Sequence, residues 1–174
     1  MSQDGRLINV IVADWGPCSS NYLSAVTWIK QIGGAAAKII QHLVNSCGLN
    51  IKLIECIGFS LGAHICGVFS IQLTTKCHKI VGKLVNPFKE SNRTIIMSRR
   101  INRCKISTVW LFKGLDAAAP MISSDVRLDT SKAGYVFCYH TSTVLAITSP
   151  IGHCDLYFNG AKNQPGCDGA IYPR

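Results

Sequence analysis

Blocks of apolar and polar residues follow one another along this chain and predict strands and helices in turn. A mostly apolar run at 7–13 predicts a buried strand, which the turn residues at 14–17 end. From about 22 to 44, apolar residues recur at roughly helical spacing and predict a long helix. Gly33 and Gly34 fall in its middle and are expected to weaken it.

The next blocks extend this alternation. The apolar run at 51–57 predicts a second strand, and the small and apolar residues at about 61–72 predict a second helix. Strand, helix, strand, helix in this order implies parallel strands with helices packed on the sheet. The stretches 109–112 and 135–139 are further candidate strands.

The junction between the second strand and the second helix reads Gly-Phe-Ser-Leu-Gly at 58–62. A G-x-S-x-G sequence between a strand and a helix predicts a nucleophile elbow, a sharp turn that exposes the serine, here Ser60. We expect both glycines to be needed because any Cβ there would collide. The alternative is an ordinary Gly/Ser turn between two core elements.

A serine hydroxyl needs a base to act as a nucleophile, and the base needs a carboxylate that orients it. In folds with such an elbow, the acid follows the serine in the chain and the histidine follows the acid. Asp116, just beyond the candidate strand at 109–112, is the best-placed acid. The backbone N–H of Leu61, the residue after the nucleophile, would donate one hydrogen bond to the oxyanion. Among later histidines, His140 and His153 are the candidates for the base.

Composition favours one globular domain over residues 1–174, because 48% of the residues are hydrophobic and only 16% are charged. No apolar stretch approaches a membrane span, so we expect no transmembrane anchor. The nine cysteines are typical of an oxidising compartment, yet residues 1–6 do not resemble a secretory signal. We therefore expect that the front of the protein is missing. No C-x-x-C pair occurs, which argues against structural zinc.

The net charge of +9 is concentrated in one stretch, since residues 86–113 carry +6 of it. A local charge run is usually a solvated loop, so we do not expect nucleic-acid binding. Residues at about 85–112 show no clear period, and we interpret them as an irregular basic insertion. Asn92 begins an N-glycosylation sequon there, which matters only in a secreted chain.

Five segments resemble the pancreatic-type (neutral) lipase family, and the arthropod lipases and phospholipases A1 more closely within it. They occur in family order at 58–64, 114–117, 126–129, 140–141 and 152–160, followed by Gln-Pro-Gly-Cys at 164–167. The resemblance implies a partial α/β-hydrolase fold with a mostly parallel sheet flanked by helices. It also implies a secreted, cofactor-free enzyme that cleaves carboxylic esters of acylglycerols or phospholipids at a lipid–water interface. Ser60 would be the nucleophile and Asp116 the triad acid.

The departures from the family pattern concern activity. The family's catalytic histidine lies beyond the segment that ends at Cys167, and its second oxyanion donor lies upstream of the first strand. We therefore expect an internal piece of a longer lipase that is inactive or crippled by itself. The family positions matching His140 and His153 are structural, although His153 remains an alternative base. His64 is expected to pack on its helix.

Two loops differ from the family as well. Lys132 stands where calcium-binding members have an acid, so we expect no metal despite Asp129 at another ligand position. Ala117 replaces a proline after the triad aspartate, which is expected to loosen that loop. The loop at 141–152 has only twelve residues, a slight indication of phospholipase-like specificity.

The sequence thus predicts a carboxylic ester hydrolase, a triacylglycerol lipase or phospholipase A1, that acts through an acyl-serine intermediate. One alternative is a non-catalytic, lipase-like lipid-binding protein, which would not require Ser60 and Asp116. Another is a module that binds anionic surfaces through residues 86–113.

Overall fold

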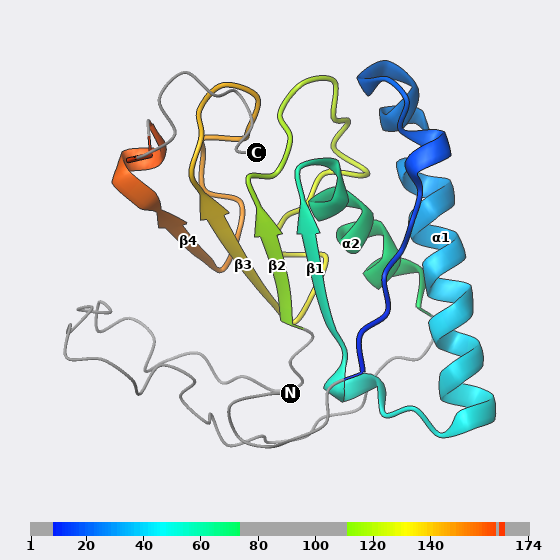
Figure 1. Ribbon diagram of the computed structural model, residues 1–174. Coiled ribbons are helices and arrows are strands. Elements are labelled where there is room, and N and C mark those ends of the chain that lie inside the picture. Colours follow the sequence, from blue (N-terminus) through cyan, green and yellow to red (C-terminus); the bar gives the residue numbers. More distant parts are fainter. Residues whose placement is uncertain (1–8, 74–110, 163, 166–174) are drawn as a thin grey trace, which may run out of the picture.

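A computed structural model describes residues 9–73, 111–162 and 164–165, and a four-stranded sheet forms their centre (Figure 1). The strands lie in the order β1-β2-β3-β4 and every neighbouring pair is parallel. Their bounds are β1 Glu55–Phe59, β2 Leu111–Leu115, β3 Tyr135–His140 and β4 Cys154–Tyr157. The prediction of parallel strands is confirmed. All four strands therefore end at the same edge of the sheet, where α/β proteins place their sites.

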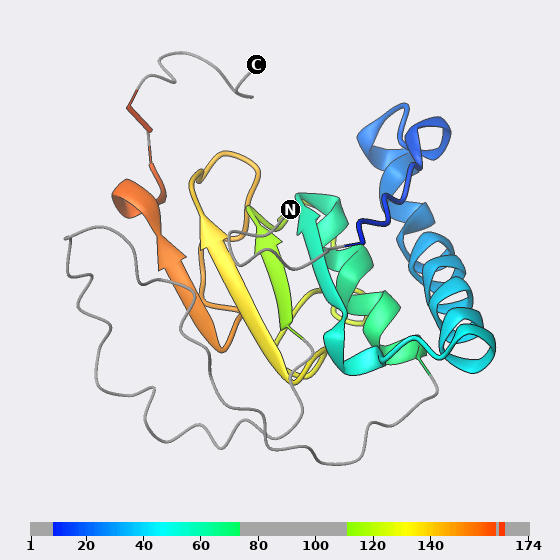
Figure 2. The same cartoon turned by 60° about the horizontal axis from the view of Figure 1, so that its bottom comes forward.

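Two α-helices pack beside β1. Helix α1 spans Tyr22–Cys47, and α2 spans Leu61–Gln72 and lies between α1 and the sheet (Figures 1 and 2). Short 3-10 helices occupy Gly16–Cys18, Ile51–Leu53 and Phe158–Ala161. A parallel sheet with helices packed on it confirms the predicted α/β class. Neither helix, nor any other in the described ranges, combines the length and the apolarity that a membrane crossing requires.

Gly33 and Gly34 do not interrupt α1, contrary to the expected weak middle. A Cβ on Gly33 would lie 2.8 Å from the Val68 Cβ, and a Cβ on Gly34 would lie 2.5 Å from the Gln72 side chain. The two glycines therefore lie where α1 packs closely against α2. Helix–helix packing offsets the low helix propensity of glycine here.

Two strand predictions need correction. Residues 9–13 form no strand, and the side chains there are exposed by 63–80% at Val10, Ile11 and Val12. An apolar run is therefore not sufficient for a strand, which also needs a neighbouring strand to pair with. The strand predicted at 51–57 begins only at Glu55, because Ile51–Leu53 forms a 3-10 helix behind the side-chain cap of Asn50. Residues 7–8 lie outside the described part of the chain.

Strands β2 and β3 confirm the two later strand predictions, although 109–110 lie outside the described residues. Strand β4 was not predicted, because its four residues are too few to show a clear alternation. Along β3, alternate residues Val136, Cys138 and His140 are buried beneath the helix-side loops. The other residues of β3 are half-buried aromatic rings on the opposite face, with centroids 5.6–5.7 Å apart.

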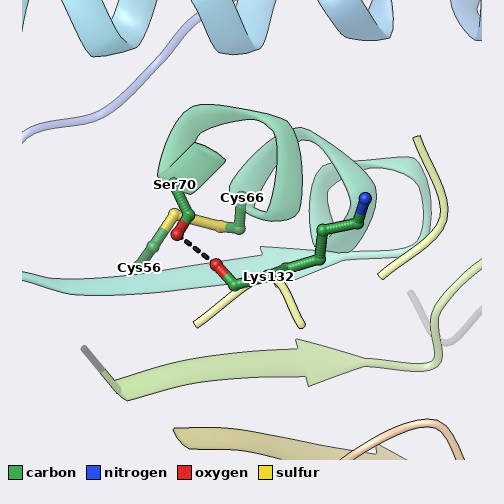
Figure 3. Close-up of a disulfide and its surroundings, with 4 residues drawn as sticks. All are labelled: Cys56, Cys66, Ser70 and Lys132. Atoms are coloured by element: carbon green, nitrogen blue, oxygen red, sulfur yellow. Dashed lines mark hydrogen bonds between the residues drawn. A yellow bond between two sulfur atoms is a disulfide. The ribbon is translucent and has the colours of Figure 1, made fainter. Parts of the chain in front are cut away.

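A disulfide between Cys56 and Cys66 joins β1 to α2 across the elbow (Figure 3). Close to it, the Ser70 hydroxyl donates to the carbonyl oxygen of Lys132. The sequence had left disulfide pairing open. Within the described ranges the remaining cysteines are free thiols, namely Cys18, Cys47, Cys138 and Cys154. Burial, and next the charge of Asp155, raise the pKa of Cys138 to about 12, so this thiol is protonated at neutral pH.

Candidate active site

Ser60 occupies the turn between β1 and α2 with φ 54° and ψ −117°, a strained conformation for a residue with a Cβ. The close passage of the chain needs Gly58, because a Cβ there would lie 2.2 Å from the carbonyl oxygen of Gly62. The strand, turn and helix of a nucleophile elbow are thus present. The expectation for the second glycine is wrong: a Cβ on Gly62 would meet no atom within 4 Å, because that position faces open space.

Asp116 follows the last residue of β2 and also has a positive φ, of 42°. Phe59 pairs with Leu115 in the β1–β2 register, so Ser60 and Asp116 leave neighbouring strands at the same level. The neighbouring strands are only about 4.8 Å apart. The two residues that the sequence singled out are therefore side by side at the carboxyl edge of the sheet.

Polar groups after β3 hold the Asp116 carboxylate. Its Oδ1 accepts hydrogen bonds from the backbone N–H of Thr141 (2.5 Å) and of Ser142 (3.2 Å), and the Thr141 hydroxyl donates to Oδ2. A carboxylate offers about four lone-pair sites, so capacity for one more donor remains on Oδ2. The sequence did not identify these partners, because only the β2–β3 pairing brings them to Asp116.

Backbone hydrogen bonds connect the elbow to the strand ends. The N–H of Ser60 donates to the Leu115 carbonyl oxygen (2.9 Å), and the N–H of Asp116 donates to the Tyr139 carbonyl oxygen (2.8 Å). The N–H of Ala118 donates back to the Ser60 carbonyl oxygen (3.3 Å). The positions of Ser60 and Asp116 are thus fixed by the main chain and do not depend on side-chain contacts alone.

Leu61 is the first residue of α2. The N–H groups in the first turn of a helix have no partner within the helix, and they carry the positive end of its dipole. A negative charge that develops beside Ser60 would meet such an N–H. This location suits the predicted oxyanion donor.

A cavity of about 290 Å³ opens beside Asp116. Side chains from the ends of three neighbouring strands and from the segment after β4 line it, namely Phe59, Leu115, Asp116, Tyr139, Thr141 and Phe158. Most of these side chains are apolar or aromatic, and the rings of Tyr139 and Phe158 stack with centroids 6.1 Å apart. The cavity thus combines an apolar wall with one carboxylate, a surface suited to an apolar group that carries a polar end.

The histidines considered as bases lie elsewhere. His153 is exposed, stacks on Tyr135, and accepts the Val136 N–H through Nδ1 (3.0 Å). Val136 is near the start of β3, roughly 13 Å along the strand from the level of Asp116. The His140 ring lies in the core, with Nδ1 2.9 Å from the Ile147 carbonyl oxygen and Nε2 2.8 Å from Asp155 Oδ1. Both rings hold loops together, as the resemblance implied.

His64 is fully buried on α2, which confirms that it packs there. Its ring contacts the carbonyl oxygen of Ala118 through Nε2 (2.8 Å) and the N–H of Leu128 through Nδ1 (2.9 Å). Burial lowers the pKa of His64 first, the bond to Ala118 opposes this, and the charge of Arg127 adds to the lowering. These two contacts could not be predicted from the sequence, because they join residues more than fifty positions apart.

The two loops that depart from the family pattern are well anchored. The Lys132 side chain is buried and its ammonium donates to the carbonyl oxygen of Asp125 (3.0 Å), while Asp129 Oδ1 accepts the N–H of Ser131 (2.7 Å). Ala117 is buried and its carbonyl oxygen accepts the N–H of Ile147 (2.7 Å). The loop after Asp116 is therefore held by the neighbouring segment, although it lacks the proline.

Comparison with known proteins supports the resemblance over almost the whole chain. The family described as Lipase matches residues 1–92 and 96–173. Hepatic triacylglycerol lipase of Oryctolagus cuniculus is 31% identical over 95% of this chain and 29% of its own length. Phospholipase A1 of Vespula squamosa is 31% identical over 91% of this chain and 47% of its own length.

A third relative, phospholipase A1 member A of Bos taurus, is 31% identical over 94% of this chain and 30% of its own length. The chain thus spans less than half the length of each of these relatives. The matched ranges run through most of 85–112, and the insertion proposed there stays a prediction, because residues 74–110 lie outside the described part. With the elbow serine and the strand-end aspartate in place, a match of this extent shows that the chain belongs to the Lipase family.

Proposed function

We propose that the protein to which this chain belongs hydrolyses carboxylic esters of lipids through an acyl-serine intermediate. Ser60 is the nucleophile, Asp116 the triad acid, and the Leu61 N–H one oxyanion donor. The observation that carries this proposal is the position of Ser60 in a strained elbow, on the strand next to that of Asp116. The chain spans 29–47% of the relatives compared, so the activity of the whole protein is part of the proposal.

In the proposed reaction the Ser60 Oγ attacks the ester carbonyl while a base takes its proton. The Leu61 N–H stabilises the oxyanion that forms, and the Asp116 carboxylate orients the base and stabilises its charged form. The remaining acceptor site on Oδ2 of Asp116 is suited to an imidazole N–H. No histidine side chain in the described residues hydrogen-bonds Ser60 or Asp116, and His78 lies outside them. We expect this chain alone to be close to inactive.

The cavity next to Asp116 supports the proposed substrate class. Its mainly apolar lining fits an acyl chain, and the named relatives include both a triacylglycerol lipase and phospholipases A1. Acylglycerols and phospholipids at a lipid–water interface are therefore both proposed substrates. The Cys56–Cys66 disulfide supports secretion, because disulfides persist in oxidising compartments.

A non-catalytic lipid-binding role is less well supported. The positive φ angles of Ser60 and Asp116 store strain of about 1–3 kcal/mol each. A protein that only binds lipid gains nothing from that strain. The second alternative, a basic surface module at 86–113, falls mainly on residues outside the described part.

The test compares this chain with Ser60→Ala in two assays. Hydrolysis of a short-chain p-nitrophenyl ester should stay near background for both proteins. An alkyl fluorophosphonate should label the unaltered chain slowly: the Ser60 Oγ forms a bond to phosphorus, fluoride leaves, and the proton passes to solvent. The Ser60→Ala chain should not be labelled.

Equal labelling of the two proteins would contradict the role of Ser60. Robust ester hydrolysis that Ser60→Ala abolishes would show that a base exists within the chain. That result would favour His153 as the base and would contradict the expected loss of activity. Labelling of Ser60 with background hydrolysis is the result that the proposal predicts.

A further inference from the structure

Near the elbow, His64 is a buried, hydrogen-bonded side chain that neither triad role uses. It lies one turn into α2, has no exposed surface, and contacts two segments of the loop that follows Asp116. One contact is the Ala118 carbonyl oxygen at 2.8 Å, and the other is the Leu128 N–H at 2.9 Å. The two partners are ten residues apart in the chain.

The partners of the ring determine its protonation state. An N–H points at Nδ1, so Nδ1 must accept and carries no proton. A carbonyl oxygen lies at Nε2, so Nε2 must donate and carries the proton. His64 is therefore a neutral imidazole with its proton on Nε2, since an imidazolium would place a second N–H against that of Leu128.

Ala118 connects this ring to both proposed catalytic residues. Its N–H donates to the carbonyl oxygen of Ser60 (3.3 Å), while its own carbonyl oxygen accepts from His64. Asp116 stands two residues before it in the same segment. One residue is thus tied to the nucleophile on its N–H side and to α2 on its carbonyl side.

We infer that His64 is a positioning residue, which sets the Asp116 segment against the Ser60 elbow by holding Ala118. The effect of His64 on the reaction rests on the proposed function. That His64 holds Ala118 in place rests on the hydrogen bonds alone. His64 does not touch the reacting atoms, so its effect passes through Ala118. The Leu128 contact serves to fix the tautomer and the ring orientation.

The two ends of the ring can be separated by substitution. His64→Gln can place an amide N–H near the position of Nε2 and keep the bond to Ala118. His64→Asn can place an amide oxygen near Nδ1 and keep only the bond to Leu128. Both variants lose the ring, but Asn is one methylene shorter than Gln and loses more packing, so Ile40→Ala on the far part of α1 serves as a destabilised control.

The first measurement does not require activity. Amide hydrogen exchange of Ala118 is compared with that of Leu49, whose N–H bonds the Leu43 carbonyl oxygen at the end of α1. Exchange of Ala118 relative to Leu49 should rise at least about tenfold in His64→Asn, while His64→Gln and Ile40→Ala should stay within about threefold of the unaltered chain. In the unaltered chain, a nitrogen-detected NMR spectrum should show His64 with its proton on Nε2.

The second measurement is the rate at which an alkyl fluorophosphonate labels Ser60. The rate should fall at least about tenfold in His64→Asn and less than about threefold in His64→Gln. Equal losses in the two variants would show a merely structural histidine and overturn the inference, as would an Nδ1–H tautomer. If Ser60 of the unaltered chain is not labelled at all, the proposed function fails, and amide exchange still decides whether His64 holds Ala118.

Discussion

Ser60 and Asp116 share an unusual backbone conformation, since both are non-glycine residues with positive φ. Such a conformation persists only when the surroundings over-determine it. Here the N–H groups of Ser60 and Asp116 donate to carbonyl oxygens at the ends of neighbouring strands, and the Ser60 carbonyl oxygen accepts the N–H of Ala118. Part of the backbone strain therefore lies at the two residues that the proposed reaction uses, although Met121, Asn159 and Ala161 also have positive φ.

At the same scale, the neutral state of His64 makes folding sensitive to pH. Burial is the main cause that lowers its pKa from 6.5, so between its folded and unfolded pKa values the unfolded chain binds more protons. The contribution of neutral His64 to the free energy of unfolding is complete above about pH 6.5. It is lost as pH falls toward the folded pKa, with a slope of up to about 1.4 kcal/mol per pH unit. Urea unfolding from pH 7.5 to 5 should show the decline, and His64→Gln should flatten it. An equal slope in the variant would show that His64 does not cause the decline.

The sequence identified the proposed catalytic residues, but it did not identify the residues that hold them in place. Ser60 was evident because a nucleophile elbow has a local sequence signature, and Asp116 because it follows a strand. Thr141 and Ala118, which hold the carboxylate and the elbow, have no such signature. Their roles depend on which strands become neighbours, and a short sequence window carries little information on that pairing.

At the scale of elements, the contact between α1 and α2 is decided by two adjacent glycines with different surroundings. A Cβ on Gly33 would press on the Val68 Cβ (2.8 Å) and on the Ile65 carbonyl oxygen (3.1 Å), and neither can move easily. A Cβ on Gly34 would meet the end of the Gln72 side chain, which can rotate away. The pair therefore tests whether packing or propensity dominates.

Gly33→Ala should lower the free energy of unfolding by roughly 1–2 kcal/mol, because overpacking exceeds the gain in helix propensity. Gly34→Ala should be neutral or raise it by up to about 1 kcal/mol. Denaturant unfolding of both variants measures the difference, with circular dichroism to show that α1 remains helical. A similar loss in both variants would mean that the helices cannot tolerate any Cβ at this crossing.

The elements predicted correctly from the sequence are those with a long apolar pattern or with a clear turn motif beside them. The helical spacing over 22–44 and the small-residue run after Ser60 gave α1 and α2 almost at their observed bounds. The run at 7–13 failed, because apolar residues form a strand only where a neighbouring strand accepts their hydrogen bonds. Strand β4 was missed for the opposite reason: its four residues carry too short a pattern, and pairing with β3 makes them a strand.

At the scale of the whole molecule, the described part of the chain is organised around one edge of its sheet. All four strands end there, α2 begins there, and the loops after β2 and β3 meet in the Ala118–Ala146 bridge. The Cys56–Cys66 disulfide ties β1 to α2 on either side of the elbow. The strand before Ser60 and the helix after it are thus covalently linked to each other.

That cross-link should contribute measurably to stability. The cysteines are ten positions apart, and closing a loop of that size in the unfolded chain stabilises the fold by about 3 kcal/mol. The double variant Cys56→Ala/Cys66→Ala should lose about 2–4 kcal/mol in urea unfolding, and dithiothreitol should destabilise the unaltered chain but not the variant. Cys47→Ala, at an exposed free thiol, should change stability by less than about 0.5 kcal/mol. If dithiothreitol leaves the unaltered chain as stable as before, the disulfide does not support the fold, and the argument from it for an oxidising compartment fails.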